Sequence, residues 1–319
     1  MDKIVKFGES DLEIVPLIFG GNVFGWTLDE KQSFEILDQF MDLGFNAIDT
    51  ANNYSHWVPG NKGGESETII GNWLKERNNR EKVVLMTKVA GRFGYDSKTN
   101  TKADYIKEQV ELSLNRLQTE YIDLYQTHYD DLDTPVEETL RAYEDLIKEG
   151  KVRYIGASNI KTDRLLESLD TSSRLGLPKY ISLQPEYNLY DREKYETEYA
   201  ETVQQYGLAV IPYYSLASGF LSGKYLTDDD FSKSKRGEGI EKRYWNERGQ
   251  RIVAALNDVA SAYRTSAASV ALAWLIAQPN ITAPIASATK ESHLQGFVSA
   301  LQLRLGDEAL EKLNTASRY

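Results

Sequence analysis

The stretch IDLYQTHYDDLDTPVEETLRAYEDLIKEGKVRYIGAS, residues 122–158, decides the fold class of this chain. It opens with an apolar run at 122–128 and closes with another at 152–158, and neither run alternates cleanly between apolar and polar residues. Such runs are typical of parallel strands that are buried on both faces. The segment between them carries a predicted capping box at Thr134-Pro135-Val136-Glu137 and should end as a helix near Gly150. We therefore predict a strand–helix–strand unit.

The same unit recurs along the chain. Further strand candidates, which bring the number to eight, lie at 15–20, 45–50, 83–89, 181–187, 209–215 and 282–287. Segments with a stripe of apolar residues at helical spacing separate them, for example at 30–43 and 104–117. Eight strand-then-helix units predict an α/β fold, a closed (β/α)8 TIM barrel, with residues 1–319 as a single domain. A doubly wound open sheet is the alternative, but no G-x-G-x-x-G follows the first strand.

Two additions to a plain barrel are expected. The start of the chain, KIVKFGESDLEIVP at 3–16, is predicted to form a β-hairpin that docks on the bottom of the barrel. The connection between strands seven and eight is unusually long, and it contains a polar stretch followed by predicted helices at about 246–263 and 266–277. Long connections of this kind are usually functional lids or disordered segments.

The composition excludes several functional classes. The net charge of -11 argues against a nucleic acid or an anionic membrane as a partner. Cysteine is absent, which excludes disulfides and thiolate catalysis, and the presence of only three histidines argues against a His-rich metal centre. The N-terminus MDKIVKFGES lacks an apolar signal stretch, and no run of about 18 apolar residues occurs. We expect a cytoplasmic protein, and leave open whether it is a monomer or a homo-oligomer.

Four polar residues form the strongest functional signal: Asp49, Tyr54, Lys88 and His128. Three of them close strand candidates, and Tyr54 follows the first of these strands by five residues. The carboxyl ends of barrel strands share one rim, and neighbouring strands lie about 4.8 Å apart, so these side chains are expected to meet. Each alone has an ordinary structural explanation, such as a helix cap for Asp49 or packing for Tyr54. Together they predict a proton-transfer site.

The chemistry of such a site follows from the residue types. A phenol has a pKa of about 10, and a neighbouring ammonium is expected to lower the pKa of Tyr54. Asp49 would hold Lys88, and His128 would bind a substrate oxygen or relay a proton. A phenol tuned in this way would donate a proton to a carbonyl oxygen or accept one from an alcohol. Since no side chain supplies a hydride, a nicotinamide cofactor is expected.

Several segments of the chain resemble the aldo-keto reductase superfamily, in its bacterial and potassium-channel-β-like branch. The resemblance covers nearly the whole chain, and its motifs are FNAIDTANNYS (45–55), GGESETIIG (63–71), VVLMTK (83–88), YIDLYQTH (121–128), GKVRYIGASN (150–159), QPEYNL (184–189) and YYSLASGFLSGKY (213–225). It implies an NADP-dependent oxidoreductase that reduces an aldehyde or ketone, or catalyses the reverse reaction. Tyr54 would be the general acid, Lys88 and Asp49 its supports, and His128 the carbonyl-orienting group.

The resemblance also implies the cofactor contacts. Ser158, Asn159 and Gln184 would bind the nicotinamide carboxamide, and Tyr214 would stack on the ring. The pyrophosphate would lie against Ser215, Leu216, Ser218, Gly219, Leu221, Gly223 and Lys224. The adenosine 2′-phosphate would bind near the start of a helix at Ser287, Thr289, Lys290 and His293. NADP(H) is the preferred cofactor and NAD(H) the alternative, because Gly296 and Phe297 replace the acidic residue and the adenine-contacting Asn usual in the family.

The substrate pocket should be formed by loops that follow the strands. Its candidate walls are aromatic, which suits an aldehyde or ketone, and they are Phe24, Trp26, Trp57, Phe93, Tyr95 and Tyr129. Asp130 either indicates a hydroxylated substrate or is a solvated loop charge, and we favour the loop charge. Two other functions stay open: a Schiff-base aldolase that uses Lys88, and a nicotinamide-binding regulatory subunit with slow turnover.

Overall fold

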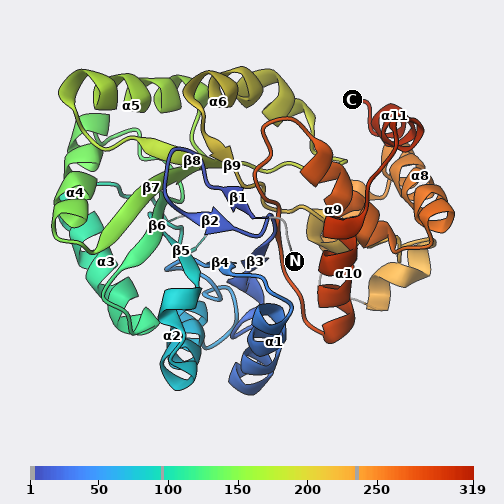
Figure 1. Ribbon diagram of the computed structural model, residues 1–319, viewed down its shortest axis with the longest axis horizontal. Coiled ribbons are helices and arrows are strands. Elements are labelled where there is room, and N and C mark those ends of the chain that lie inside the picture. The colour runs from blue at the N-terminus through green and yellow to red at the C-terminus, as the bar shows by residue number, and fades with distance from the viewer. Residues whose placement is uncertain (1–3, 95–96, 234–236) are drawn as a thin grey trace.

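This computed structural model, which describes residues 4–94, 97–233 and 237–319, is a (β/α)8 barrel (Figure 1). Within those residues, eight parallel strands pair in the order β10-β3-β4-β5-β6-β7-β8-β9. Thr282 N and Ala283 N donate hydrogen bonds to Val210 O at 2.9 and 3.3 Å, which joins β9 to the segment before β10 and closes the ring. The predicted barrel is confirmed. Its strands are β3 (Ile18–Gly20), β4 (Ala47–Asp49), β5 (Val84–Val89), β6 (Ile122–Thr127), β7 (Val152–Ser158), β8 (Tyr180–Gln184), β9 (Ala209–Val210) and β10 (Ile285–Ala286).

Helices surround the ring of strands, as Figure 1 shows. The segments predicted at 30–43 and 104–117 are helical to within a residue or so at each end. Among the described residues, no helix combines the length and the apolar character needed to cross a membrane. The helices that follow the first six barrel strands are α1 (Glu30–Asp42), α2 (Glu65–Arg77), α3 (Ala103–Leu117), α4 (Val136–Lys148), α5 (Thr162–Leu175) and α6 (Ala200–Tyr206), and those after β10 are α10 (Glu291–Gln302) and α11 (Asp307–Ala316).

The capping box predicted for α4 is wrong. The N-cap position is Pro135, and no side chain caps the helix. The helix starts one residue later than the box requires, so Thr134 precedes the N-cap position. Its hydroxyl donates to Asp131 Oδ2 at 2.6 Å within the preceding loop. Gly150, with φ 74, lies just beyond the end of α4 as expected.

The N-terminal hairpin closes the bottom of the barrel. Strands β1 (Val5–Lys6) and β2 (Glu13–Ile14) are antiparallel, and in Figure 1 they lie across the opening of the ring. Phe7 and Ile14 are fully buried, in one cluster with Met86 and Leu124 from the barrel interior. The predicted docking site is therefore confirmed, and the opposite rim stays open for chemistry.

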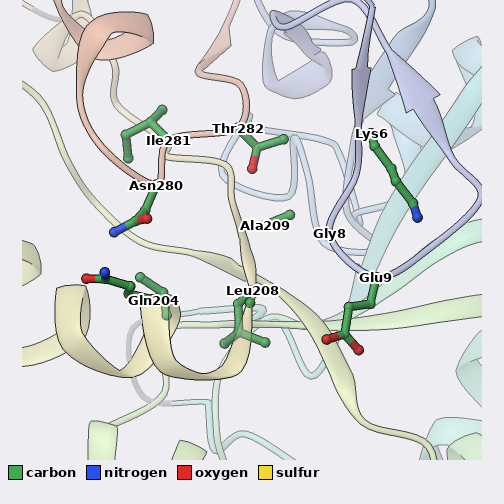
Figure 2. Close-up of a pocket in the computed structure, with 11 residues that line it drawn as sticks. Lys6, Gly8, Glu9, Gln204, Leu208, Ala209, Asn280, Ile281 and Thr282 are labelled. Carbon is green, nitrogen blue, oxygen red and sulfur yellow. The ribbon is translucent and has the colours of Figure 1, made fainter.

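A hollow of about 360 Å³ lies beside the hairpin (Figure 2). Its walls come from the hairpin, the end of α6, the start of β9 and the segment before β10. Polar side chains at its edge include Lys6, Glu9, Gln204, Asn280 and Thr282. The hollow thus lies at the amino-terminal ends of the strands, away from the four residues singled out above.

The long connection between β9 and β10 is largely ordered as helix. The two helices predicted there are confirmed as α8 (Glu247–Tyr263) and α9 (Ala267–Ala277). The sequence did not predict α7 (Gly237–Tyr244) or the short 3-10 helices η4 (Ala217–Ser222) and η5 (Asp228–Lys233). Helix α7 is short and mostly polar, and it buries only Gly237, Ile240 and Tyr244, so too few apolar residues mark it as a helix in the sequence.

The hairpin makes a testable contribution to stability. Phe7→Ala should lower the free energy of unfolding by about 3–5 kcal/mol, because it removes a fully buried ring from the bottom of the barrel. Ile4→Ala, at a side chain that is 60% exposed in the same segment, should cost far less. Urea denaturation measures both. Equal stability of Phe7→Ala and the parent protein would contradict a sealing role for the hairpin.

Candidate active site

The four residues lie together at the carboxyl end of the barrel. Asp49 is the last residue of β4, Lys88 is near the end of β5, and His128 directly follows β6. Tyr54 lies in the turn after β4, and its ring is edge-on to that of His128, with centroids 6.0 Å apart. Because β4, β5 and β6 are paired neighbours, their ends bring these groups to one point of the rim.

Lys88 is the centre of this group. Its side chain is fully buried, and Nζ donates to Asp49 Oδ2 at 2.6 Å, to Thr50 O at 2.7 Å and to Tyr54 Oη at 3.0 Å. An ammonium has three hydrogens, so every one of them is used. This arrangement compensates for the loss of water around a buried charge and fixes the phenol of Tyr54 in place.

Burial sets the protonation state of Tyr54. Loss of hydration raises its pKa well above 10, and the negative charge of Asp49 raises it further. Our expectation that Lys88 would lower this pKa is therefore not met, because burial and the Asp49 carboxylate outweigh the ammonium. Burial also lowers the pKa of Lys88, although Asp49 opposes that change. Tyr54 is thus a neutral hydrogen-bond donor across the physiological pH range.

His128 is held as a neutral imidazole. Burial lowers its pKa well below 6.5, and the charge of Lys88 and the neighbouring His56 lower it further. Its Nδ1 is buried and has no hydrogen-bond partner among the described residues. A buried N–H without an acceptor is costly, so the proton belongs on Nε2. His128 can therefore donate a hydrogen bond from Nε2 beside the Tyr54 ring.

The residues expected to hold a carboxamide lie at the ends of β7 and β8. Asn159 Nδ2 donates to His128 O at 2.9 Å and to Ser158 Oγ at 3.0 Å, which ties this group to the proton-transfer residues. Tyr213 Oη donates to Asn159 Oδ1 at 2.9 Å. Gln184 is buried, with its amide nitrogen directed inward at Asp49. A ring of polar groups thus surrounds one end of the site.

The loop after β9 has the backbone that a phosphate cradle requires. Positive φ angles occur at Tyr214, Ser218, Gly219 and Gly223, and the Tyr214 side chain is 46% exposed. A Cβ built on Gly219 would approach no heavy atom other than Lys224 Nζ, at 3.9 Å, so the loop surface is open there. Ser215 and Leu221 are buried, so they can contribute backbone groups and not side chains, whereas Leu216 is half-buried.

Three basic side chains gather near the start of α10. The pKa of His293 is lowered, first by burial and then by the charges of Lys290 and Lys224, which places all three close together. Thr289 N donates to His293 Nδ1 at 3.2 Å. The Ser287 hydroxyl, which was predicted to bind the phosphate, is hydrogen-bonded to Gly20 O and Asn22 Oδ1, at 2.7 and 2.6 Å. The cluster therefore suits a phosphate, with Lys224 and Lys290 as its cations and a neutral His293 beside them.

Phe297 lies in the core. Its side chain is 2% exposed, and its ring packs edge-on against Phe45 at 6.3 Å. Gly296 faces helix α9, where an added Cβ would come within 3.6 Å of Ser269 Oγ. The resemblance places these residues where the family contacts adenine, but here both serve helix packing, so neither provides a polar adenine contact.

An aromatic collar surrounds Tyr54. The ring of Trp57 is edge-on to those of Trp26, Tyr54 and His56, at 5.6, 6.1 and 5.3 Å. Tyr129 lies against His128 at 4.8 Å. His56, which sequence reasoning missed, also lies 6.1 Å from Phe93, and its Nδ1 is 2.8 Å from Asn53 O. The collar offers flat apolar walls beside the neutral phenol.

Two predicted wall or loop residues have other roles in the structure, and a third cannot be placed. Phe24 is fully buried and stacks on Phe19 at 5.3 Å, so it is a core residue and cannot face a substrate. Asp130 forms an ion pair with Arg164 at 3.2 Å, so it is not the solvated charge we expected. Tyr95 lies outside the described residues.

The comparison with known proteins agrees with this arrangement. The model of the Aldo/keto reductase family matches residues 16–318. The chain belongs to this family. One similar protein is an uncharacterized oxidoreductase, YrpG, of Bacillus subtilis, with 34% identity over 96% of this chain and 93% of the relative. Another is the aldo-keto reductase dtxS3 of Metarhizium robertsii, with 36% identity over 88% of this chain and 82% of the relative. A probable voltage-gated potassium channel subunit beta of Arabidopsis thaliana is 31% identical over 93% of this chain and 90% of the relative.

Family membership makes this chain an oxidoreductase. No group of three or more His, Cys, Asp or Glu side chains suited to a metal ion occurs among the described residues. The open loop at Gly219, the basic cluster at Lys224 and Lys290 and the polar groups at Asn159 and Gln184 fit a nicotinamide dinucleotide. The donor set therefore matches the cofactor that this family's chemistry requires.

The buried pair of Asp49 and Lys88 predicts a particular pattern of stability. Lys88→Met should cost about 3–5 kcal/mol, because it leaves a carboxylate buried without its cation. The double variant Lys88→Met/Asp49→Asn should recover part of that loss, since the uncompensated charge is gone. Denaturant unfolding of both variants and of Asp49→Asn measures the coupling. A Lys88→Met protein as stable as the parent would contradict the ion pair.

Proposed function

We propose that this protein reduces small aldehydes or ketones to alcohols, or catalyses the reverse reaction, with NADP(H) as its preferred cofactor and Tyr54 as general acid–base. The bonding of Lys88 to Tyr54 carries the proposal. An ammonium can only donate, so Tyr54 Oη accepts from it, and the phenol's own hydrogen is left for another acceptor. A carbonyl oxygen beside Tyr54 and His128 would take that position.

The reaction divides between cofactor and protein. A bound nicotinamide would supply the hydride, and the protein would supply the proton and the geometry. Tyr54 would donate its proton to the carbonyl oxygen as negative charge develops there, while His128 Nε2 donates a hydrogen bond to the same oxygen. Ser158, Asn159 and Gln184 would orient the carboxamide, Tyr214 would stack on the ring, and Ser215–Lys224 would carry the pyrophosphate.

The aromatic collar supports a substrate with an apolar or aromatic group next to its carbonyl. Trp26, Trp57 and Tyr129 offer ring faces and edges. The carboxylates of Asp49 and Glu186 already have cationic partners, Lys88 at 2.6 Å and Arg243 at 2.7 Å. A pocket of this kind favours flat, uncharged carbonyl compounds.

The two alternatives differ in how they fit the structure. A Schiff-base aldolase needs a lysine amine that is free to attack a carbonyl, but Lys88 is fully buried and all its hydrogens are used. A cofactor-binding regulatory subunit with slow turnover is the second candidate, because plant relatives are named as potassium channel subunits. The complete group of proton-transfer residues favours turnover.

Tyr54→Phe tests the proton donor. The variant should reduce aldehydes about 10²–10⁴-fold more slowly, because a general acid is lost, while it binds the cofactor nearly normally. Tyr125→Phe is the matched control, since it removes a fully buried tyrosine hydroxyl that has no partner among the described residues. Steady-state oxidation of NADPH measures the rates. Wild-type turnover in Tyr54→Phe would refute the assigned mechanism.

The pH dependence follows from the shifted pKa values. Neither Tyr54, with its pKa well above 10, nor His128, with its pKa well below 6.5, titrates in the neutral range. The value of kcat/KM for reduction should therefore be flat between about pH 6.5 and 8. Burial lowers the pKa of Lys88 from its ordinary value of 10.5, so Lys88 should lose its proton before that pH is reached. The value of kcat/KM should fall only there, because Asp49 and Tyr54 then lose the ammonium that they bind. A fall in rate between about pH 6.5 and 8 would contradict these assignments.

Lys290→Ala tests the choice between the two cofactors. The dissociation constant for NADPH should rise roughly tenfold, as expected when one charge-assisted contact worth about 1.5 kcal/mol is lost. Binding of NADH, which lacks the 2′-phosphate, should change little. Lys148→Ala, which removes a 65% exposed lysine in α4, is the control. Fluorescence titration with both cofactors decides: equal weakening of both would remove Lys290 from the phosphate site.

A further inference from the structure

Gln126 lies in the barrel interior, between the proton-transfer residues and the group expected to hold the nicotinamide. It is fully buried in β6, and its register partner in β5 is Lys88. Gln126 Nε2 donates to Asp49 Oδ1 at 3.0 Å, and Gln126 Oε1 accepts from Gln184 Nε2 at 3.1 Å. The amide of Gln126 thus links Asp49, which holds Lys88, to Gln184 at the end of β8.

These contacts allow Gln184 only one orientation. Its Nε2 donates to Asp49 Oδ1 at 3.0 Å as well as to Gln126 Oε1, so both of its amide hydrogens are used. A carboxylate only accepts hydrogen bonds, so the nitrogen and not the oxygen of Gln184 must face Asp49. The remaining group, Gln184 Oε1, is left as an acceptor for the hydrogens of a carboxamide.

The backbone leaves room for this connection. Gly156 in β7 is the register partner of Gln126 and lies between β6 and β8. A Cβ at Gly156 would lie 3.2 Å from Gln126 Cγ and 2.3 Å from Ser182 Oγ. Glycine at this position therefore lets the Gln126 side chain pass across β7 and reach Gln184.

We propose that Gln126 is a positioning residue that couples the two halves of the site. It holds the Gln184 amide so that Oε1 faces the carboxamide, and it shares the charge of Asp49, which keeps Lys88 bonded to Tyr54. The inference rests on the proposed function. It adds that cofactor orientation and the proton donor depend on one shared amide, whose nitrogen must donate and whose oxygen must accept.

Gln126→Glu tests the coupling through pH. When the introduced carboxyl is protonated it reproduces the amide, since its O–H donates to Asp49 and its C=O accepts from Gln184. When it is ionised it repels Asp49 and has no hydrogen to donate. Burial and the Asp49 charge raise the pKa of this carboxyl above its ordinary value of about 4.3. The ratio of variant to wild-type kcat/KM should therefore be near one at acid pH and fall at least tenfold as pH rises through that pKa.

Gln126→Met supplies a readout that does not depend on turnover. It keeps the volume of the side chain but removes both hydrogen bonds, so the Gln184 amide is held only by its remaining hydrogen bond to Asp49 Oδ1 and loses part of its restraint. Titration of intrinsic fluorescence with NADPH should show binding weakened about tenfold, as for one lost hydrogen bond to a charged network. Ser182→Ala is the matched control, because Ser182 Oγ is buried in the same interior with no partner among the described residues. Its binding and kinetics should equal those of the wild type.

Two results would overturn the proposal. One is a Gln126→Glu protein whose rate relative to wild type does not change with pH. The other is a Gln126→Met protein that binds NADPH as tightly as Ser182→Ala does. Both require a wild-type protein that reduces carbonyl compounds and binds the cofactor. A wild type that does neither refutes the proposed function itself, and this outcome is distinct from normal wild-type activity with unaffected Gln126 variants.

Discussion

The ammonium of Lys88 is buried without contact with water, and the rest of the site is arranged around it. Removing such a charge from water costs several kcal/mol unless its hydrogens are all accepted. Here the acceptors are Asp49, a backbone carbonyl and Tyr54, at 2.6, 2.7 and 3.0 Å. Two of these acceptors, Asp49 and Thr50, lie at the end of β4 and directly after it, so the ammonium is bound to the chain at the point where the strand ends.

The barrel interior is divided by this charge. Below it, the hairpin residues Phe7 and Ile14 pack with Met86 and Leu124 in an apolar cluster that excludes water. Above it, Asp49 connects to Gln126 and Gln184 in a continuous hydrogen-bonded network. At the rim, burial of Tyr54, Lys88 and His128 themselves is the largest cause of their pKa shifts. Tyr54 stays protonated and His128 stays neutral, which suits two hydrogen-bond donors directed at one carbonyl oxygen.

Sequence reasoning could predict the elements because apolar periodicity and strand ends are local properties. Eight buried runs predicted the barrel, and the polar residues that close 45–50, 83–89 and 122–128 predicted the rim group. It failed where the outcome depends on competing partners. The Thr134 hydroxyl is bonded to Asp131 and caps nothing, and Asp130 is paired with Arg164. Burial, which outweighs Lys88 in setting the pKa of Tyr54, is a property of the folded chain.

Gln126 is a residue whose role the sequence indicates, although it was not among the predicted site residues. A strand buried on both faces has no place for an amide unless partners satisfy it, so Gln126 within IDLYQTH indicates a polar network. Its partners, however, lie 77 and 58 residues away in the chain, and only the closed barrel brings them together. The burial of Phe24 and Phe297 likewise depends on how helices and strands pack in the folded barrel, so the sequence alone did not predict it.

In the proposed reaction, Tyr54, held by Lys88, protonates a carbonyl while a nicotinamide supplies the hydride. A single-turnover experiment tests this most directly: the protein is loaded with NADPH and mixed with a panel of aromatic and aliphatic aldehydes and ketones, and the absorbance of reduced nicotinamide is followed. We expect rapid oxidation with at least one aromatic aldehyde and formation of one alcohol per NADPH consumed. Tight binding of NADPH with no oxidation by any member of the panel would contradict the proposed reaction and favour the regulatory alternative.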